Sequence, residues 1–411
     1  MTSRERILAA WTGKPADHVP LTTWSFGLTA PDSLRWEIDG VPRNFWYSGR
    51  LEHLHTLPQP WTVEDDFRRV LAWRKLGVDD IIDVSVPWGR DPDVTWKDTL
   101  VGVGKMDSQY PVMIRDYQTP SGSVRHAVRK TGEDPGTGWV IQPDCVPLIE
   151  DYNIPRAVRH IVTGAADLGP LKHLYRKPDA AGIAAFQTRM QTVHSFAEKE
   201  GVPVQAWAGF GMDAVVWFCG TEGAVLLAMD DPVAFGGLID LITECDLARV
   251  ELAATTPGVD LVCERGWYSS TDFWSPALFD QFLFPHIQAL AHAAHRHGKL
   301  FGYVMTTGVE TLGPRLADAG VDVLYFVDPI QDRIPLERAR DLLGSRMTLV
   351  GGTNALSVQT CNADRIRREV QSAVKILGTT NRFILHPIDA LFPDTPWAGI
   401  EMLIEAWKTC R

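Results

Sequence analysis

The chain has 411 residues, of which 45% are hydrophobic and 22% charged, so it has the composition of an ordinary globular protein with a large core. Its 51 acidic residues outnumber its 40 basic ones, for a formal net charge of −11, which argues against nucleic acid binding because that function needs clustered Lys and Arg. Fifteen Trp residues exceed what packing alone requires and suggest a cleft lined by aromatic side chains.

The amino-terminal segment predicts a short helix and no targeting signal. Thr2 and Glu5 have the spacing of a capping box, and the apolar stretch after them is too short for a signal peptide. No run approaches the roughly 18 apolar residues of a membrane span. The six Cys residues are scattered and form no CxxC motif, which is typical of reduced thiols. We therefore expect a cytoplasmic protein.

The first third of the chain is irregular. It predicts a strand over 18–24, a helix over 62–75 and a buried strand over 79–86. Between 93 and 145, short apolar and polar runs alternate with Gly and Pro. That pattern indicates an insertion of antiparallel hairpins.

From about residue 155 onward, short apolar strands alternate with helices. The expected strands are 203–208, 259–264, 299–305, 321–327, 347–351 and 382–386. This alternation predicts a parallel sheet with crossover helices. Because no Gly-x-Gly-x-x-Gly follows the first strand and no Walker loop is present, we expect a (β/α)8 TIM barrel, with residues 1–411 forming one domain.

An ordered set of short motifs resembles the uroporphyrinogen decarboxylase superfamily. The motifs are residues 2–20, 77–82, Asp231-Pro232, 275–285, 320–322, 349–354 and 392–396. Each motif alone is unspecific, and their order along nearly the whole chain carries the resemblance. It implies a barrel whose site lies at the carboxyl ends of the strands.

The superfamily that the chain resembles has two branches. One decarboxylates uroporphyrinogen without a cofactor and carries arginines after its first strand, whereas the corresponding segment 24–31 has none. Arginine is the favoured partner of carboxylates, so uroporphyrinogen is not the expected substrate. The other branch transfers methyl groups through corrinoid proteins, often with zinc. Its His-x-Cys pair and final Cys fall on Tyr303, Met305 and Asp389, so the thiolate zinc site is absent.

Four side chains are candidate catalytic groups. Glu264 ends one expected strand and Asp389 follows another, at the end where barrel sites lie, and the resemblance gives Asp389 a functional position. The alternatives are a structural ion pair for Glu264 and an Asx turn for Asp389. Asp83, in the second strand of the resemblance, is a candidate acid. Tyr303 is a candidate proton donor, on the side of its strand that the resemblance implies is the lumen.

A metal set without thiolates is a further expectation. Glu264, His386 and Asp389 could supply the oxygen and nitrogen ligands that some corrinoid-dependent O-demethylases of the resembled superfamily use. A core role for His386 is the alternative. His292, His295 and His297 end a helix, where the dipole favours them, and we interpret them as solvated or packed.

Most of the substrate-binding candidates are aromatic. Trp24, Trp207 and Trp267 lie near strand ends and would suit a flat apolar substrate. Met305 and Asn354, at the ends of later strands, complete the expected set.

The function expected from these residues and the resemblance is methyl transfer. A methyl group would pass from a small methylated substrate, such as a methoxylated aromatic, to a corrinoid (cobalamin) on a partner protein, as in O-demethylase systems. One alternative is a cofactor-free decarboxylase for another substrate, with a carboxyl of raised pKa, Asp389 or Asp83, as the proton donor. The other alternative is a non-catalytic binding barrel.

Overall fold

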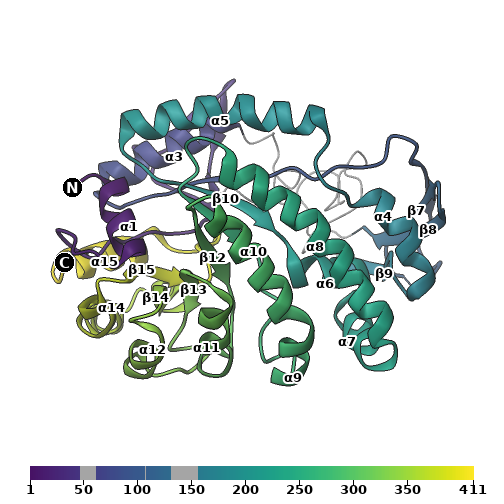
Figure 1. Cartoon of the computed structure of the whole chain (residues 1–411). Helices are drawn as coiled ribbons and strands as arrows, with labels where there is room; N and C mark the ends of the chain where they lie inside the picture. The colour runs from purple at the N-terminus through teal and green to yellow at the C-terminus, as the bar shows by residue number, and fades with distance from the viewer. Residues whose placement is uncertain (47–61, 107, 131–155) are drawn as a thin grey trace.

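Seven parallel strands form one curled sheet in the computed structural model, which describes residues 1–46, 62–106, 108–130 and 156–411 (Figure 1). The strands neighbour each other in chain order: β5 (Ile82–Ser85), β10 (Val204–Gly209), β11 (Leu261–Glu264), β12 (Leu300–Val304), β13 (Val323–Val327), β14 (Thr348–Asn354) and β15 (Phe383–Ile388). Every residue in them is buried except the partly buried Leu300. Strands that are buried along their whole length are what a parallel sheet covered on both faces requires.

Helices alternate with these strands and cover the outside of the sheet (Figure 1). They include α3 (Val63–Lys75), α5 (Ala180–Glu200), α8 (Pro232–Thr255), α10 (Phe284–Arg296), α11 (Val309–Ala319), α12 (Leu336–Leu343), α14 (Ala363–Leu377) and α15 (Trp397–Lys408). Their starts follow from local chemistry, since Asp231 caps α8 by accepting the N–H of Ala234, with Pro232 at the first helical position. The predicted capping box of α1 (Ser3–Thr12) forms between Thr2 and Glu5.

An irregular segment, residues 20–25, takes the place of an eighth strand. The Thr22 N–H donates to the Leu385 carbonyl over 3.0 Å, and on the other side the Asp79 N–H donates to the Leu21 carbonyl over 3.0 Å. Pro20 has no N–H with which to extend a ladder. The expected eight-stranded barrel is therefore, within the described ranges, a seven-stranded parallel sheet with this segment between β15 and β5.

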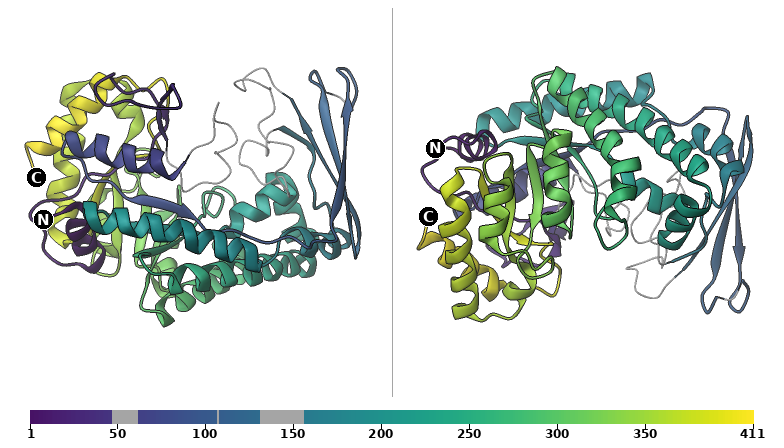
Figure 2. Two further views of the ribbon diagram at one scale, coloured as in Figure 1. Left: turned by 90° about the horizontal axis from the view of Figure 1, so that it is seen from above. Right: turned by 60° about the horizontal axis from the view of Figure 1, so that its bottom comes forward.

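A separate antiparallel sheet lies at the end of the molecule away from both termini (Figure 2). It consists of β6 (Thr95–Val101), β7 (Val112–Thr119), β8 (Gly122–Arg129) and β9 (Ala157–Arg159), in that order. The antiparallel strands β6 to β8 lie in the range where hairpins were expected, and β9 lies beyond it. Residues 131–145 of that range lie outside the described residues. Two short antiparallel sheets complete the described strands. In one, β1 (Phe26–Leu28) pairs with β4 (Phe45–Trp46), and in the other, β2 (Trp36–Ile38) pairs with β3 (Val41–Arg43).

Further helices fill the connections. They are η2 (Ala165–Asp167), α4 (Leu168–Leu174), α6 (Gly211–Cys219), α7 (Thr221–Asp230), α9 (Pro276–Leu278), the π-helical turn η3 (Phe279–Leu283), α13 (Ala355–Gln359) and η4 (Gly378–Thr380). No single helix in the described ranges is long and apolar enough to cross a membrane, while α6 and α7, bent by 99°, pass that length and composition test only as a pair.

The core has two layers, and the alternation of side chains along each strand assigns residues to them. Leu261, Cys263 and Val304 belong to the apolar cluster inside the curled sheet. Val262 and Tyr303 belong to the cluster between the sheet and the helices. This alternation decides which candidate side chains can reach the barrel interior.

Candidate functional site

Five aromatic side chains, here called the aromatic floor, pack together inside the carboxyl end of the sheet: Trp24, Trp207, Trp267, Tyr325 and Phe326. Trp24 is central, with ring centroids 5.8 Å from Trp207 and from Trp267. It stacks on Tyr325 at 5.2 Å and 21° and meets Phe326 edge-on at 5.2 Å. Trp24 and Trp207 are 4% and 1% exposed, whereas Trp267 is partly exposed. The three predicted tryptophans therefore come together as a packed floor, not as open walls.

A hydrogen-bonded chain runs through the floor. Asp83 Oδ1 accepts Gln205 Nε2 over 2.5 Å and Trp207 Nε1 over 2.9 Å. The Tyr325 hydroxyl donates to Gln205 Oε1 over 2.5 Å. Asp83 is the second residue of β5, below the strand end, and only 3% exposed. Sequence reasoning missed Gln205, although its two-residue spacing from Trp207 on one strand places both side chains on the same face.

His386 lies at the edge of the floor. Its ring centroid is 5.3 Å from that of Trp24, and its Nδ1 lies 3.0 Å from the Thr22 hydroxyl. Burial lowers the His386 pKa to about 3, so the ring is neutral near pH 7. Its Nε2 is buried without a hydrogen-bond partner among the described residues. His386 thus faces the barrel interior as a neutral group.

Glu264 faces the helix layer instead of the barrel mouth. Its Oε1 lies 2.8 Å from Nε2 of His286 on α10, and the Thr243 hydroxyl on α8 lies 2.7 Å from His286 Nδ1. Burial raises the Glu264 pKa. Burial opposes a charge on His286, yet the neighbouring Glu264 raises the His286 pKa. Both shifts favour the protonated form, so each group binds a proton more readily in the fold than it does in water. Because Cys263 points inward, Glu264 must point outward, and the expectation that it shares a cleft with Asp389 is wrong.

Tyr303 and Met305 also face the helices, contrary to the lumenal position that the resemblance implied. Both belong to the outer apolar cluster and are at most 1% exposed, while Val304 between them faces inward. Burial raises the Tyr303 pKa well above its ordinary value, so its hydroxyl stays protonated. Side chains alternate along a strand, so Tyr303 and Met305 must face outward when Val304 between them faces inward. Both therefore pack between the barrel wall and the helices.

Asp389 directly follows β15, and Asn354 is the last residue of β14. Asp389 is partly exposed, and two residues later the Leu391 N–H donates to the Trp24 carbonyl over 2.8 Å, so the loop that carries Asp389 runs beside the backbone of Trp24. Asn354 is buried: its Nδ2 donates to Asp328 Oδ2 over 2.6 Å, and its Oδ1 accepts the Leu356 N–H over 2.8 Å. Asn354 thus caps α13, which accounts for its side chain without a substrate.

Two buried α8 residues, which sequence reasoning missed, hold the chain beside the floor. Asp246 Oδ2 accepts the N–H groups of Phe210 and Gly211 over 2.8 and 3.0 Å. Arg249 donates to the Val86 carbonyl over 2.9 Å and to Asp246 over 3.0 Å. The segments that leave β5 and β10 are therefore fixed to one ion pair. The two residues are three apart on one helix, and the sequence did not reveal their role because the backbone groups that they bind are distant in sequence.

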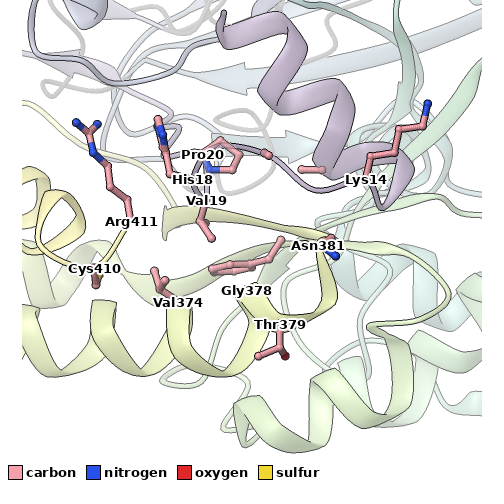
Figure 3. Close-up of a pocket in the computed structure, with 13 residues that line it drawn as sticks. Lys14, His18, Val19, Pro20, Val374, Gly378, Thr379, Asn381, Cys410 and Arg411 are labelled. Carbon is pink, nitrogen blue, oxygen red and sulfur yellow. The ribbon is translucent and has the colours of Figure 1, made fainter. Parts of the chain in front are cut away.

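A cavity of about 350 Å³ lies at the opposite end of the sheet (Figure 3). Lys14, His18, Val19, Asn381 and Arg411 are among the residues around it. It sits beside the start of β15, whereas barrel active sites lie at the carboxyl ends of the strands. We therefore do not assign the catalytic site to this cavity.

Comparison with known proteins identifies the family. The family described as Uroporphyrinogen decarboxylase (URO-D) matches residues 149–410, more than half of the chain. The chain belongs to the URO-D family. The uroporphyrinogen decarboxylases of two strains of Thermus thermophilus are 30% identical over 170 residues, 41% of this chain and 46% of each relative. The match thus spans less than half of those relatives.

A solved methyltransferase from Methanosarcina mazei shares the fold of this URO-D family member. It has a TM-score of 0.57 and 17% sequence identity, and the alignment covers 100% of this chain and 99% of that chain. At this identity the likeness shows the fold alone.

Zinc, which part of the resembled superfamily uses, finds no ligand set among the residues that the structure describes. Across 1–46, 62–106, 108–130 and 156–411, no group of three or more His, Cys, Asp or Glu side chains could hold a metal ion. The expected set of Glu264, His386 and Asp389 is not assembled, because Glu264 turns toward His286. We route no chemistry through a metal at these residues.

The arginine beside the floor is engaged by protein groups. Arg265 is 1% exposed, its Nε donates to Asp213 Oδ2 over 3.0 Å, and its guanidinium lies 4.8 Å from the Trp267 ring centroid. Segment 24–31 contributes no arginine. A substrate rich in carboxylates therefore finds no arginine partner in that segment, and Arg265 is already paired with Asp213.

Proposed function

We propose that this URO-D family member transfers a methyl group from a small methoxylated aromatic compound to a corrinoid acceptor carried by a partner protein. The observation that carries the proposal is the aromatic floor at the carboxyl end of the strands, with Trp267 partly exposed. A flat ring gains both apolar burial and ring contacts on such a surface. Uroporphyrinogen, which carries eight carboxylates, would instead need arginines that segment 24–31 lacks.

Asp389 is the residue that we assign to proton transfer. It is partly exposed beside the floor, where a carboxyl can approach the oxygen of a bound methyl ether. In the proposed reaction the methyl–oxygen bond breaks, the oxygen takes a proton, and the methyl group bonds to the acceptor. The corrinoid would supply the cobalt nucleophile, and this chain would bind, orient and protonate the donor.

Decarboxylation is the second candidate, and the curated relatives favour it. The relatives at 30% identity are named as uroporphyrinogen decarboxylases. In that reaction Asp389 would protonate the carbon from which carbon dioxide leaves. Asp83 is less suited to this role, because its Oδ1 already accepts two hydrogen bonds.

The test measures methylation of cob(I)alamin by its absorption change, with a panel of methoxylated aromatics. We expect Asp389→Asn to keep donor affinity and to lose about 10²-fold or more of the turnover. Asp394→Asn, at an exposed acid on the same loop, is the matched control and keeps its activity. Equal activity of both variants would remove Asp389 from the reaction.

A further inference from the structure

Asp83 links the parts of the aromatic floor to one another. A single carboxylate oxygen receives the Nε1–H of Trp207 and the amide of Gln205, at 2.9 and 2.5 Å. Both donors come from β10, whereas Asp83 comes from β5. The indole of Trp207 has only one N–H, so this bond fixes which edge of the ring turns toward β5.

The link continues across the barrel through Gln205. Because Gln205 donates its amide N–H to Asp83, its oxygen is left to accept the Tyr325 hydroxyl at 2.5 Å. Tyr325 is the ring on which Trp24 stacks at 5.2 Å and 21°. The orientation of three floor rings thus depends on the carboxylate of Asp83.

We propose that Asp83 is a positioning residue of the site, which holds the aromatic floor in the arrangement that receives the flat part of the substrate. This rests on the proposed function only in that the floor is taken as the substrate surface. Asp83 is 3% exposed beneath Trp207, so it acts through the rings and not on the reacting atoms. A catalytic acid at the same position would be expected to donate its own proton, which is the competing role.

Three variants separate these roles. Asp83→Asn keeps an acceptor oxygen of the same shape and removes the charge. Asp83→Leu keeps the size and removes the acceptor. Trp207→Phe keeps a ring and removes the N–H. Val128→Ala, at a buried residue of β8 in the distant antiparallel sheet, controls for loss of stability alone.

The first measurement is steady-state methyl transfer. We expect Asp83→Leu to raise KM for 2-methoxyphenol about tenfold and to leave kcat nearly unchanged. A tenfold change corresponds to the net free energy of about one hydrogen bond. Asp83→Asn should stay close to the wild type in both. In a double-mutant cycle, Trp207→Phe should add less to Asp83→Leu than it does alone, because both remove the same bond.

The second measurement is independent of activity. Indole ¹⁵N-labelled protein gives one N–H signal for Trp207, assigned by its loss in Trp207→Phe. We expect Asp83→Leu to shift this signal and to speed its hydrogen exchange, and Asp83→Asn to leave it protected. If Asp83→Leu does not fold, Gln205→Leu breaks the same chain one residue further on and should raise KM likewise.

Two results would overturn the proposal. One is an unchanged Trp207 signal together with an unchanged KM in Asp83→Leu. The other is a loss of kcat of about 10²-fold or more in Asp83→Asn with an unchanged KM, which would make Asp83 a catalytic acid. If the wild type methylates no acceptor, the proposed function fails, while the Trp207 signal and the calorimetric Kd of 2-methoxyphenol still decide the role of Asp83.

Discussion

The carboxylate of Glu264 lies 2.8 Å from Nε2 of His286, a residue of the helix layer. Both side chains are buried, at 1% and 5% exposure. The last residue of β11 is therefore a structural group that ties α10 to the barrel wall.

His286→Leu should destabilise the fold by about 3 kcal/mol, because removal of one partner leaves the other buried without its counter-charge. Urea unfolding followed by circular dichroism measures the change. His292→Leu, at an exposed position on the same helix, is the control and should change stability by less than about 0.5 kcal/mol. Equal stability of both variants would show that the pair contributes nothing.

The same pair predicts a pH dependence on the alkaline side. Burial raises the Glu264 pKa above 4.5, and Glu264 raises the His286 pKa above 6.5. The folded protein then binds more protons than the unfolded chain, so the contribution of the pair is present below pH 6.5 and is lost as the pH rises through the folded pKa of His286. Glu264→Gln should flatten this slope in urea titrations from about pH 6 to pH 9. A slope identical to the wild type would contradict the assignment.

His126 predicts the opposite dependence on the acid side. Both of its ring nitrogens are buried without a hydrogen-bond partner among the described residues, and burial, with His160 and Arg115 nearby, lowers its pKa to about 3. The unfolded chain binds the proton more readily, so stability falls as the pH drops from 6.5 toward 3. His126→Leu should make that fall shallower, as followed by thermal unfolding at several pH values. His292→Gln should leave it unchanged, and an equal effect of the two variants would reject the account.

The burial of the Cys263 thiol predicts that it holds no zinc. Cys263 is fully buried and its pKa is raised well above the ordinary value by burial, so the thiolate that zinc requires is unfavourable there. Mass spectrometric metal analysis of purified protein should find no stoichiometric zinc that Cys263→Ser removes. Zinc that disappears in that variant would show a thiolate site.

Local chemistry explains what could be predicted from the sequence. The Thr2 and Glu5 capping box depends on neighbours within a few residues, and it was predicted. The strand ranges followed from apolar runs, as for the expected 299–305 and the observed Leu300–Val304. Trp24, Trp207 and Trp267 came together because each lies near the carboxyl end of the sheet.

What could not be predicted depends on partners distant in sequence and on which face a strand turns inward. Glu264 was expected at the mouth, and one residue of alternation sends it to His286. Tyr303 was placed in the lumen by the same kind of error, since a register difference of one residue reverses every side chain of a strand. Asp83 was expected as an acid, and its partners Gln205 and Trp207 lie more than a hundred residues away.

The most direct test of the central claim uses one substrate that offers both reactions. A methoxybenzoate labelled with ¹³C in its methyl group and ¹⁴C in its carboxyl group is incubated with the enzyme and cob(I)alamin. The account predicts ¹³C-methylcobalamin and the matching hydroxybenzoate, with ¹⁴C retained on the ring. Release of ¹⁴C-labelled carbon dioxide, with no label on cobalamin, would contradict it and assign the chain to decarboxylation.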